Sequence, residues 1–426
     1  MASFFIPLTG LESDSIALNT IANDLSNMNT TAFKAQTTNF SDLFYQQIGA
    51  TGSGDPIQVG AGVQVATNST SFTQGSINST GNSTDVALNG SGFFIANSPS
   101  GGTEYTRAGN FSLDPKGVLV TASGLNVMGY PAVKGVVNTN APLAAITIPV
   151  GQVEQPQPTT GFSMTANLNA SSAAGTTFPA QITLYDSLGV SHVATVTYTQ
   201  TGTNTWSYSM ALPASDFTSG VSTPVTGTMS FNSSGNLTSV TPAGGAATPV
   251  GTAAGSISSI PVAFSGLADG AANLNMQWNL LGASGTPTVS QVAAASAVST
   301  TIQDGYTSGQ YQSFTVGSDG TVSATFSNGQ RMAVGQLALA SVSNLQGLAL
   351  KGNGNYETTL SSGTASVGVA GTAGRGTLQD GALEQSNVNI SAEFSQLIIA
   401  QRAFEANSKA VTTFDTVTQE TINMIH

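Results

Sequence analysis

The chain has 426 residues, more than one ordinary hydrophobic core can organise, so we expect two or three domains. Charged residues make up only 7%, and the 40% hydrophobic share favours folded β domains over a disordered chain. The net charge of −12, with nine Lys and Arg in all, excludes the basic patches that a nucleic-acid binder needs. Without Cys, disulfides and thiolate metal sites are also excluded.

The first residues are not those of a secretory signal peptide, because they lack a basic flank and carry Glu12 and Asp14. We therefore expect that export, if it occurs, takes a route that leaves the N-terminus intact and uncleaved. Apolar runs in the sequence stay well short of the roughly 18 residues that a bilayer span requires, so we expect no membrane insertion.

The N-terminal segment has the spacing of a helix that packs along another helix. Its apolar side chains recur in heptad steps at Leu11, Leu18, Ile21, Leu25 and Met28. Pro7 suits the start of a helix and Thr9 is a possible cap. These signals predict a helix from about Leu8 to Asn27.

The next stretch alternates between turn signals and short strand patterns. The Gly-rich residues Gly49 to Gly62 predict a flexible connector, and Val63 to Gly75 alternates as a strand does. From Ser83 onward the strand patterns become dense. One example is the run Val86 to Leu88, which is followed by a turn at Asn89-Gly90 and a further apolar run.

A large insert follows, from Ala141 to about Val298. It contains alternating strand patterns on either side of a turn at Asp186-Ser187-Leu188-Gly189, and a second turn comes just before Trp206. The stretch from Ile302 to Val342 then returns to strand patterns that we assign to the earlier β domain.

The last segment, Ser386 to His426, contains no Gly and no Pro and predicts one long helix, capped by Asn389 or Ser391. Its apolar positions recur in steps of three and four or multiples of seven, at Ile390, Phe394, Leu397, Phe404, Val411, Ile422 and Ile425. Polar residues dilute this seam, so we expect the helix to need many neighbours. The two ends of the chain are able to pair with each other.

The predicted fold class is therefore mainly β with α-helical termini. Paired, coiled-coil-like N- and C-terminal helices carry an inner β domain, and an outer β domain is inserted in the inner one. The expected boundaries are a terminal helical domain at 1–30 with 386–426, a connecting segment at 31–70, an inner β domain at 71–145 with 295–385, and an outer β domain at 146–294.

Catalytic chemistry finds little support in this sequence. The two histidines are His192, which we interpret as an ordinary surface or core residue, and His426, the last residue. Without Cys they make a transition-metal site improbable. The carboxylates stand mostly beside Gly or Ser, where turn roles explain them better than paired acid–base catalysis does. We expect a non-enzymatic chain with no catalytic, cofactor-binding or metal-binding residues and no cofactor.

Three stretches resemble the bacterial flagellar axial proteins, the rod and hook family. The first is NDLSNMNTTAFK, Asn23 to Lys34, in which Ala32 stands where the family usually has Gly. The second comprises TDVALNGSGFFIA and EYTRAGNFSLDPKGVLVTASGLNVMGY, within which we expect Arg107 to form a structural salt bridge. The third is Gly381 to Val417. Together they cover the first 130 residues and the last 45, in the family's order.

The length of the insert favours the hook branch of this family. The resemblance implies a homopolymer, a flexible curved tube that acts as a universal joint and transmits motor torque from rod to filament. It also implies location in the flagellar hook or basal body, outside the cell, and partners among the distal rod, hook cap, hook–filament junction proteins and the flagellar export apparatus. The twelve apolar seam residues named above are then the hypothetical assembly interface. The alternatives are a distal rod or hook-junction subunit of the same family and, with less support, a non-flagellar secreted adhesin or enzyme.

Overall fold

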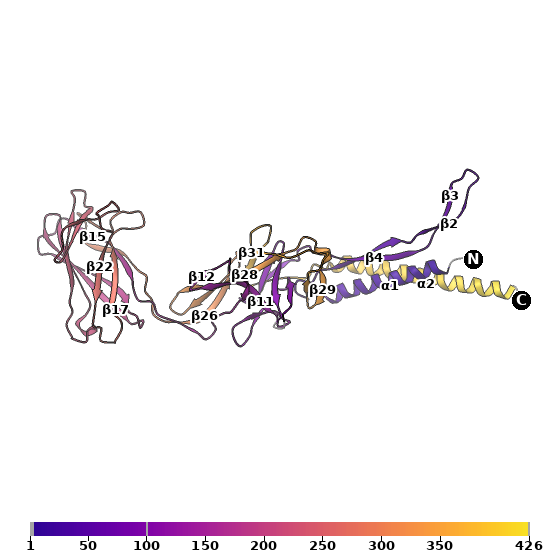
Figure 1. Cartoon of the computed structure of the whole chain (residues 1–426), viewed down its shortest axis with the longest axis horizontal. Coiled ribbons are helices and arrows are strands. Elements are labelled where there is room, and N and C mark those ends of the chain that lie inside the picture. Colours follow the sequence, from indigo (N-terminus) through magenta and orange to yellow (C-terminus); the bar gives the residue numbers. More distant parts are fainter. Residues whose placement is uncertain (1–3, 99–100, 425–426) are drawn as a thin grey trace. The chain divides into compact units, whose positions relative to one another are not determined.

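The computed structural model describes residues 4–98 and 101–424. The chain divides into two compact units (Figure 1). We call them the terminal unit, made of Met1–Val150, Ser313–Thr325 and Arg331–His426, and the insert unit, made of Gly151–Gln312 and Phe326–Gln330. The prediction of a mainly β protein with helical ends is confirmed. Neither described helix is long and apolar enough to cross a membrane.

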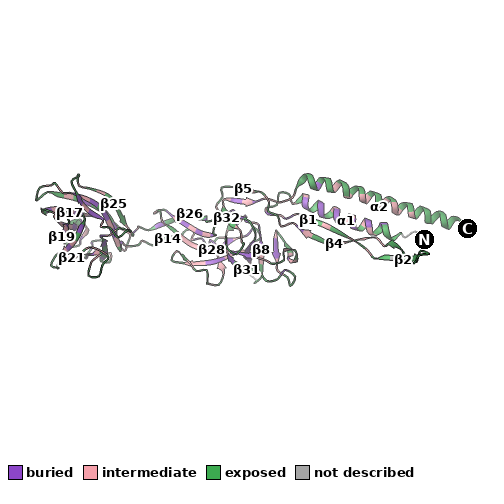
Figure 2. Ribbon diagram, turned by 90° about the horizontal axis from the view of Figure 1, so that it is seen from above, coloured by how far each residue is buried: buried purple, intermediate pink, exposed green. Residues whose placement is uncertain are grey.

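Two helices come from the two ends of the chain and pack against each other, α1 (Phe5–Ser26) and α2 (Ile390–Met424). They run antiparallel. Gly10 near the start of α1 lies beside Asn407 of α2, and Asp24 near the end of α1 is close enough to Glu393 near the start of α2 to interact with its charge. The predicted pairing of the two ends is therefore present within one chain, and Figure 2 shows that α2 is exposed over most of its length.

The first turn of each helix shows which of the predicted capping residues form a cap. Asn389 caps α2, because its Oδ1 accepts a hydrogen bond from Ala392 N–H at 3.2 Å. Thr9 does not cap α1, which begins earlier than predicted. Its hydroxyl instead donates to Ile6 O inside the helix and accepts from Val63 N–H.

A two-stranded ribbon lies against α1 and is made of β1 (Gln36–Asp42) and β4 (Val63–Thr70). The strand predicted from Val63 is thus confirmed, although it ends at Thr70. The flexible connector predicted between Gly49 and Gly62 was wrong. That stretch contributes to a second hairpin, β2 (Tyr45–Ala50) with β3 (Pro56–Gly60), closed by a hydrogen bond from Thr51 N–H to Asp55 O.

The β core of the terminal unit is one sheet, in which the strands of this unit follow the order β27-β28-β11-β7-β8-β30-β29 and short additional strands pair beside this path. These central strands are β7 (Phe93–Asn97), β8 (Thr103–Thr106), β11 (Asn126–Val133), β27 (Thr321–Phe326), β28 (Arg331–Ser341), β29 (Ala349–Gly352) and β30 (Asn355–Glu357). The additional short strands pair with β11, β28 or one another: β9 (Ser112–Leu113), β10 (Leu119–Val120), β12 (Val136–Val137), β13 (Ala144–Ala145) and β31 (Ser366–Val369). Aromatic side chains fill its core, among them Phe93 and Tyr356 with ring centroids 5.5 Å apart.

Short strand pairs connect this sheet to the helices. They are β5 (Ile77–Ser79) with β33 (Ala382–Glu384), and β6 (Val86–Asn89) with β32 (Thr377–Asp380). The predicted turn at Asn89-Gly90 exists, but β6 and β7 on either side of it pair with other strands. The Gly-containing stretch 372–381 includes β32, which forms a ladder with β6.

The insert unit contains two sheets. The strand order of the first is β16-β17-β18-β19-β20-β21, and that of the second is β22-β23-β15-β24 with β25 also on β15. Their bounds are β15 (Gly161–Asn169), β16 (Thr177–Tyr185), β17 (Ser191–Gly202), β18 (Thr205–Ala211), β19 (Val225–Phe231), β20 (Leu237–Pro242), β21 (Thr248–Pro249), β22 (Ser259–Phe264), β23 (Leu274–Asn279), β24 (Val289–Val292) and β25 (Ala297–Gln303). Both hairpins predicted around Asp186 and before Trp206 are present.

One continuous core joins the two sheets of the insert unit, and Trp206 and Trp278 are fully buried in it. The unit spans 151–312, whereas the expected outer domain spans 146–294. The return point lies later because β25 pairs antiparallel with β15 and so stays with this core. Two further strands, β14 (Val153–Glu154) and β26 (Gly309–Val316), pair with each other and not with the two sheets of this core, and β26 continues into the terminal unit.

Candidate assembly surface of the terminal helices

The buried face of α1 is made mainly of small and polar residues, with Ile21 as its one large apolar side chain. Its members follow steps of three and four along the helix: Pro7, Gly10, Ser13, Ala17, Thr20, Ile21 and Asp24. A Cβ added at Gly10 would lie 2.7 Å from the Asn407 amide nitrogen, so glycine permits the close approach of the two helices there. Beside it, Asn407 Nδ2 donates to Asp14 Oδ2 at 2.8 Å.

The predicted apolar seam is only partly buried. Leu11, Leu18 and Leu25 each lie one position beyond a member of the buried stripe and are half-buried, whereas Ile21 is buried at 7% exposure. Met28 lies beyond the end of α1 and is exposed. In α2 the half-buried members are Leu397, Phe404 and Val411, the exposed ones are Ile390, Phe394 and Ile422, and Ile425 lies outside the described residues. The seam residues therefore do not form one continuous buried contact within the chain.

Large apolar side chains are left uncovered on both helices. Ile399 is 68% exposed and Ile398 58%, and further exposed members are Phe4, Phe5, Leu8, Ile16, Val417 and Met424. An isolated exposed leucine is ordinary, but a contiguous apolar face on a helix pair marks an interaction surface. Phe44, just before the β2–β3 hairpin, is 92% exposed, and Ile48 within the hairpin is 63% exposed.

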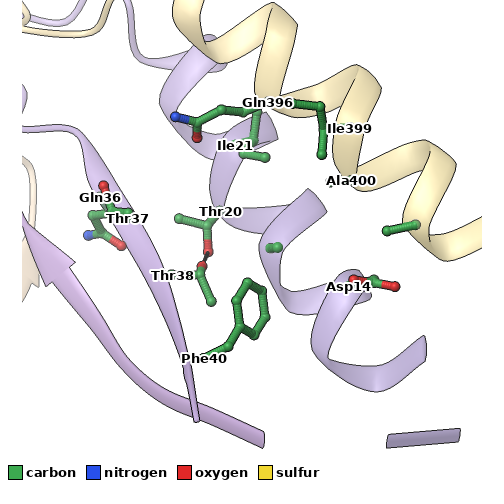
Figure 3. A pocket seen from close by; sticks show the side chains of 12 residues that line it. Asp14, Thr20, Ile21, Gln36, Thr37, Thr38, Phe40, Gln396, Ile399 and Ala400 are labelled. Carbon is green, nitrogen blue, oxygen red and sulfur yellow. Dashed lines mark hydrogen bonds between the residues drawn. The ribbon is translucent and has the colours of Figure 1, made fainter. Parts of the chain in front are cut away.

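A groove of about 290 Å³ lies between α1, β1 and α2 (Figure 3). Its walls combine apolar side chains, uncharged polar side chains and one acidic side chain: Asp14, Ala17, Thr20, Ile21, Gln36, Thr37, Thr38, Phe40, Gln396, Ile399, Ala400 and Ala403. The hydroxyl of Thr38 donates to that of Thr20 at 3.1 Å across its floor. Such a groove is shaped to receive apolar side chains, and we find no arrangement of catalytic groups among its walls.

Two carboxylates are buried where α1 meets α2. Asp24 is fully buried, and its Oδ2 accepts from Gln36 N–H at 2.7 Å while its Oδ1 has no partner in the described chain. Burial raises the pKa of Asp24 to about 6, against the opposing effect of the Gln36 hydrogen bond and with a further increase from Glu393. Burial also raises the pKa of Glu393.

We expect the stability of this junction to increase on acidification. A carboxyl whose pKa is higher in the folded than in the unfolded state destabilises the fold when ionised, so stability rises as the pH falls from about 7 to 4. The increase is at most roughly 3 kcal/mol for a shift of about two pKa units. Asp24→Asn should abolish most of this increase in stability, which urea unfolding followed by helical circular dichroism measures. The exposed Asp42→Asn serves as control, and equal pH dependence in both variants would contradict the assignment.

A buried ion cluster fixes the segment after α1 to the segment before α2. Glu384 accepts from Lys34 Nζ at 2.6 Å and from Gly75 N–H at 2.9 Å, and its other oxygen lies 3.3 Å from Arg107. The side chains of Lys34 and Glu384 are both fully buried. Burial lowers the pKa of Lys34, which the contact with Glu384 opposes. The structural salt bridge predicted for Arg107 is confirmed.

Ala32 adopts a left-handed backbone with φ of 55°, a conformation that favours glycine. It is buried, and its N–H donates to Glu384 O at 2.8 Å, so the conformation is fixed by the same junction. We expect Ala32→Gly to stabilise the terminal unit by about 1 kcal/mol, because the side chain no longer opposes this conformation. Thermal or urea unfolding measures the difference, and a destabilised variant would show that the conformation costs nothing.

The residues considered for catalysis take structural roles. Asp114 and Asp319 accept hydrogen bonds from backbone N–H groups of their own turns, as expected. His192 is buried in the insert unit, one of the two kinds of position expected. No local pattern around His192 predicts the three carboxylates that surround it there.

Comparisons with known proteins place this architecture in a class. Three family models match in chain order: the flagellar hook protein FlgE/F/G D1 domain at 87–173, the flagellar basal body protein FlaE D2 domain at 155–306 and the flagellar basal body rod FlgEFG protein C-terminal at 379–424. The class is that of the flagellar axial proteins.

The curated relatives narrow the class to one member. The flagellar hook protein FlgE of Treponema pallidum is 32% identical over 100% of this chain and 99% of its own length. That of Escherichia coli K12 is 32% identical over 99% of this chain and 100% of its own. The chain belongs to the flagellar hook protein FlgE family. The crystal structure of Helicobacter pylori flagellar hook protein FlgE2 shares the fold, with a TM-score of 0.54 at 15% identity over 72% of this chain and 100% of that one.

Proposed function

We propose that this chain is a structural, non-enzymatic subunit of the bacterial flagellar hook, and that it polymerises through its terminal helices into a flexible tube that transmits torque. The observation that carries the proposal is the uncovered apolar face of the helix pair, together with full-length similarity to hook proteins. Subunits that repeat head to tail with a rotation that does not close form a helical filament and not a ring.

The twelve predicted seam residues remain our proposed interface, and we extend it. Half-buried members such as Leu397 and Phe404 would be covered by a neighbouring copy, as would exposed Phe394. Ile398 and Ile399 join them because they are the most exposed of the large apolar residues in the first half of α2. Removing this area from water contributes about 25 cal/mol per Å².

The proposed division of labour follows the four-part organisation expected from the sequence. The terminal helices line the tube, the inner β domain forms the middle layer and the insert unit the outer one. Neutral polar outer surfaces let neighbouring subunits slide as the tube bends. The proposed partners are further copies of this chain, the distal rod, the hook cap, the hook–filament junction proteins and the export apparatus. The proposed location is outside the cell, after export without a cleaved signal peptide.

An interface variant tests the proposal. Ile399→Glu changes a side chain that is already 68% exposed, so the monomer should keep its stability within about 0.5 kcal/mol. In the polymer the new carboxylate would be buried without a partner. We expect the concentration needed for assembly to rise at least about tenfold, which corresponds to 1.4 kcal/mol.

Val133→Glu is the matched control, because Val133 is 69% exposed but belongs to strand β11 and not to either helix. Electron microscopy of concentrated protein gives the readout. Curved tubes from the wild type and the control, but not from Ile399→Glu, support the proposal. Straight tubes would favour a distal rod subunit, and the absence of tubes from every sample would reject assembly through this surface.

A further inference from the structure

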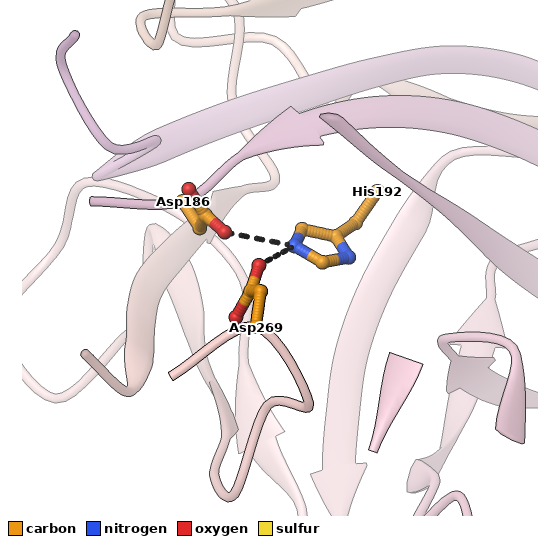
Figure 4. Close-up of side chains that lie close together, drawn as sticks. All are labelled: Asp186, His192 and Asp269. Carbon is orange, nitrogen blue, oxygen red and sulfur yellow. Dashed lines mark hydrogen bonds and ion pairs between the residues drawn. The ribbon is translucent and has the colours of Figure 1, made fainter. Parts of the chain in front are cut away.

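Three carboxylates converge on the buried imidazole of His192 in the insert unit. Nε2 lies 3.1 Å from Asp186 Oδ2 and 3.6 Å from Asp269 Oδ2, while Nδ1 lies 2.9 Å from Asp216 Oδ2. Figure 4 shows the Asp186 and Asp269 carboxylates meeting at the same ring nitrogen. The side chain of Asp186 is fully buried and that of His192 is 6% exposed, whereas Asp269 is 23% exposed and faces the solvent side.

The backbone holds these groups in place. Asp186 uses Oδ1 to accept from Leu188 N–H and Val190 N–H in the β16–β17 turn, which leaves Oδ2 directed at the imidazole. Asp269 likewise uses Oδ1 to accept from Ala271 N–H, so that its Oδ2 faces His192. In both carboxylates, hydrogen bonds to Oδ1 therefore hold the Oδ2 atom in its position facing the imidazole.

Three carboxylates surround one imidazole ring, so a single extra proton on the ring cannot balance their negative charge. A single N–H at Nε2 cannot donate fully to two carboxylate oxygens, and the Asp186 and Asp269 oxygens that face it lie within 4.8 Å of each other. Two carboxylates this close share a proton or a cation. No Lys or Arg of the described residues forms an ion pair with any of the three aspartates.

We propose that Asp186, His192 and Asp269 bind a divalent transition-metal ion of the zinc class. Their three ligand atoms lie within 4.8 Å of one another. The two distances from Nε2 bracket the roughly 3.3 Å that separates ligands in a tetrahedral site with bonds of about 2.0–2.1 Å. An imidazole ligand favours zinc, cobalt or nickel over magnesium or calcium. The fourth position is on the Asp269 side, where water has access.

Asp216 completes the site from the other side of the ring. Its contact with Nδ1 requires the proton there, which directs the lone pair of Nε2 toward the ion. Ion binding would join the β16–β17 turn to the loop between β22 and β23, two segments already connected by the hydrogen bond from Ala272 N–H to Ser187 Oγ. The ion acts as a structural clamp of the insert unit and releases the proton from Nε2 when it binds.

Nitrogen NMR on the full-length chain labelled with ¹⁵N-histidine tests the site, because only His192 and His426 contribute signals. Zinc chloride is added to chelator-treated protein and its affinity is measured by calorimetry. We expect one equivalent to bind and His192 to take the Nδ1–H form with a shifted Nε2 signal. An unchanged imidazolium with protons on both nitrogens would overturn the proposal, since a proton alone then fills the site.

Variants separate this site from adventitious binding. Asp216→Asn should weaken zinc binding by about 10- to 100-fold, and Asp269→Asn by more, because it removes a ligand from an exposed loop. Asp304→Asn, which removes a carboxylate elsewhere in the insert unit, and His426→Ala should bind zinc like the wild type. Loss of binding in His426→Ala, or unchanged binding in Asp269→Asn with an intact circular dichroism spectrum, would overturn the assignment.

Discussion

Glu384→Ala is expected to destabilise the terminal unit by about 3–5 kcal/mol, because it leaves two buried cations without their shared carboxylate. The Lys34 ammonium loses its 2.6 Å partner and keeps one hydrogen bond, to Thr73 O. The Arg107 guanidinium retains bonds to the carbonyl groups of Gly90 and Gly92. Removal of the partner from a buried ion pair costs more than the pair contributes, since the remaining charges stay desolvated.

The matched control for this change is Glu357→Ala. Glu357 also pairs with a lysine at 2.6 Å, but its side chain is 47% exposed and that of Lys351 48%. An exposed pair contributes about 0–1 kcal/mol, so this variant should remain close to the wild type. Urea unfolding followed by helical circular dichroism compares the two, while tryptophan fluorescence from Trp206 and Trp278 reports the insert unit separately. Equal losses in both variants would show that burial does not control the effect.

The strands of the insert unit could be predicted because their signals are local. Asp186 and Gly189 form a turn whose chemistry is written in four consecutive residues, with Gly189 at φ of 85° and Asp186 Oδ1 accepting from Leu188 N–H. The flanking alternation then sets the register of β16 on β17. The same logic failed for residues 49–62, where Gly and Ser suggested a flexible connector although their hydrogen bonds close a hairpin.

The contact between the helices could not be found by hydrophobic periodicity. The buried stripe of α1 has the spacing of a heptad, but Gly10, Ser13 and Ala17 are too small or too polar to register as apolar positions. The apolar residues one position further along, such as Leu11 and Leu18, stood out in the sequence and are only half-buried. Small residues allow the helix backbones to approach closely, a contact whose benefit depends on the facing helix and so cannot be read from one segment.

The ion cluster around Glu384 and the cluster around His192 show a second limit of prediction from the sequence. Lys34 and Glu384 are 350 residues apart, and only the resemblance of their two segments to one family suggested that they belong together. His192 meets Asp216 and Asp269 because η1 (Ala214–Asp216) and the loop after β22 lie against the start of β17. Each of these residues looks ordinary in its own stretch, and a composition argument against metal sites could not anticipate their convergence.

Phe404→Pro is expected to abolish assembly while the β units remain folded. Proline in the interior of α2 removes the hydrogen bond from this residue's N–H and clashes with the carbonyl group of Ala400, which costs about 3 kcal/mol or more. The break falls between Ile398 and Ile399 on one side and Val411 on the other, so the two halves of α2 could no longer present the proposed contact face in one register. Leu25→Pro should have the same consequence through α1.

Phe404→Leu is the control, because it keeps both the apolar side chain and the helix. We expect tubes in electron micrographs of Phe404→Leu and none from Phe404→Pro at the same concentration. Helical circular dichroism should fall only in the proline variant, and the fluorescence of Trp206 and Trp278 should not change in either. Normal tubes from Phe404→Pro would exclude α2 as the assembling element.

Amide exchange gives an independent check of the proposed assembly surface. We expect weak protection of both helices in the dilute monomer, because their contact face is covered only by neighbouring copies. Strong protection of both helices in the dilute monomer would mean that they need no partner, and it would contradict the proposal.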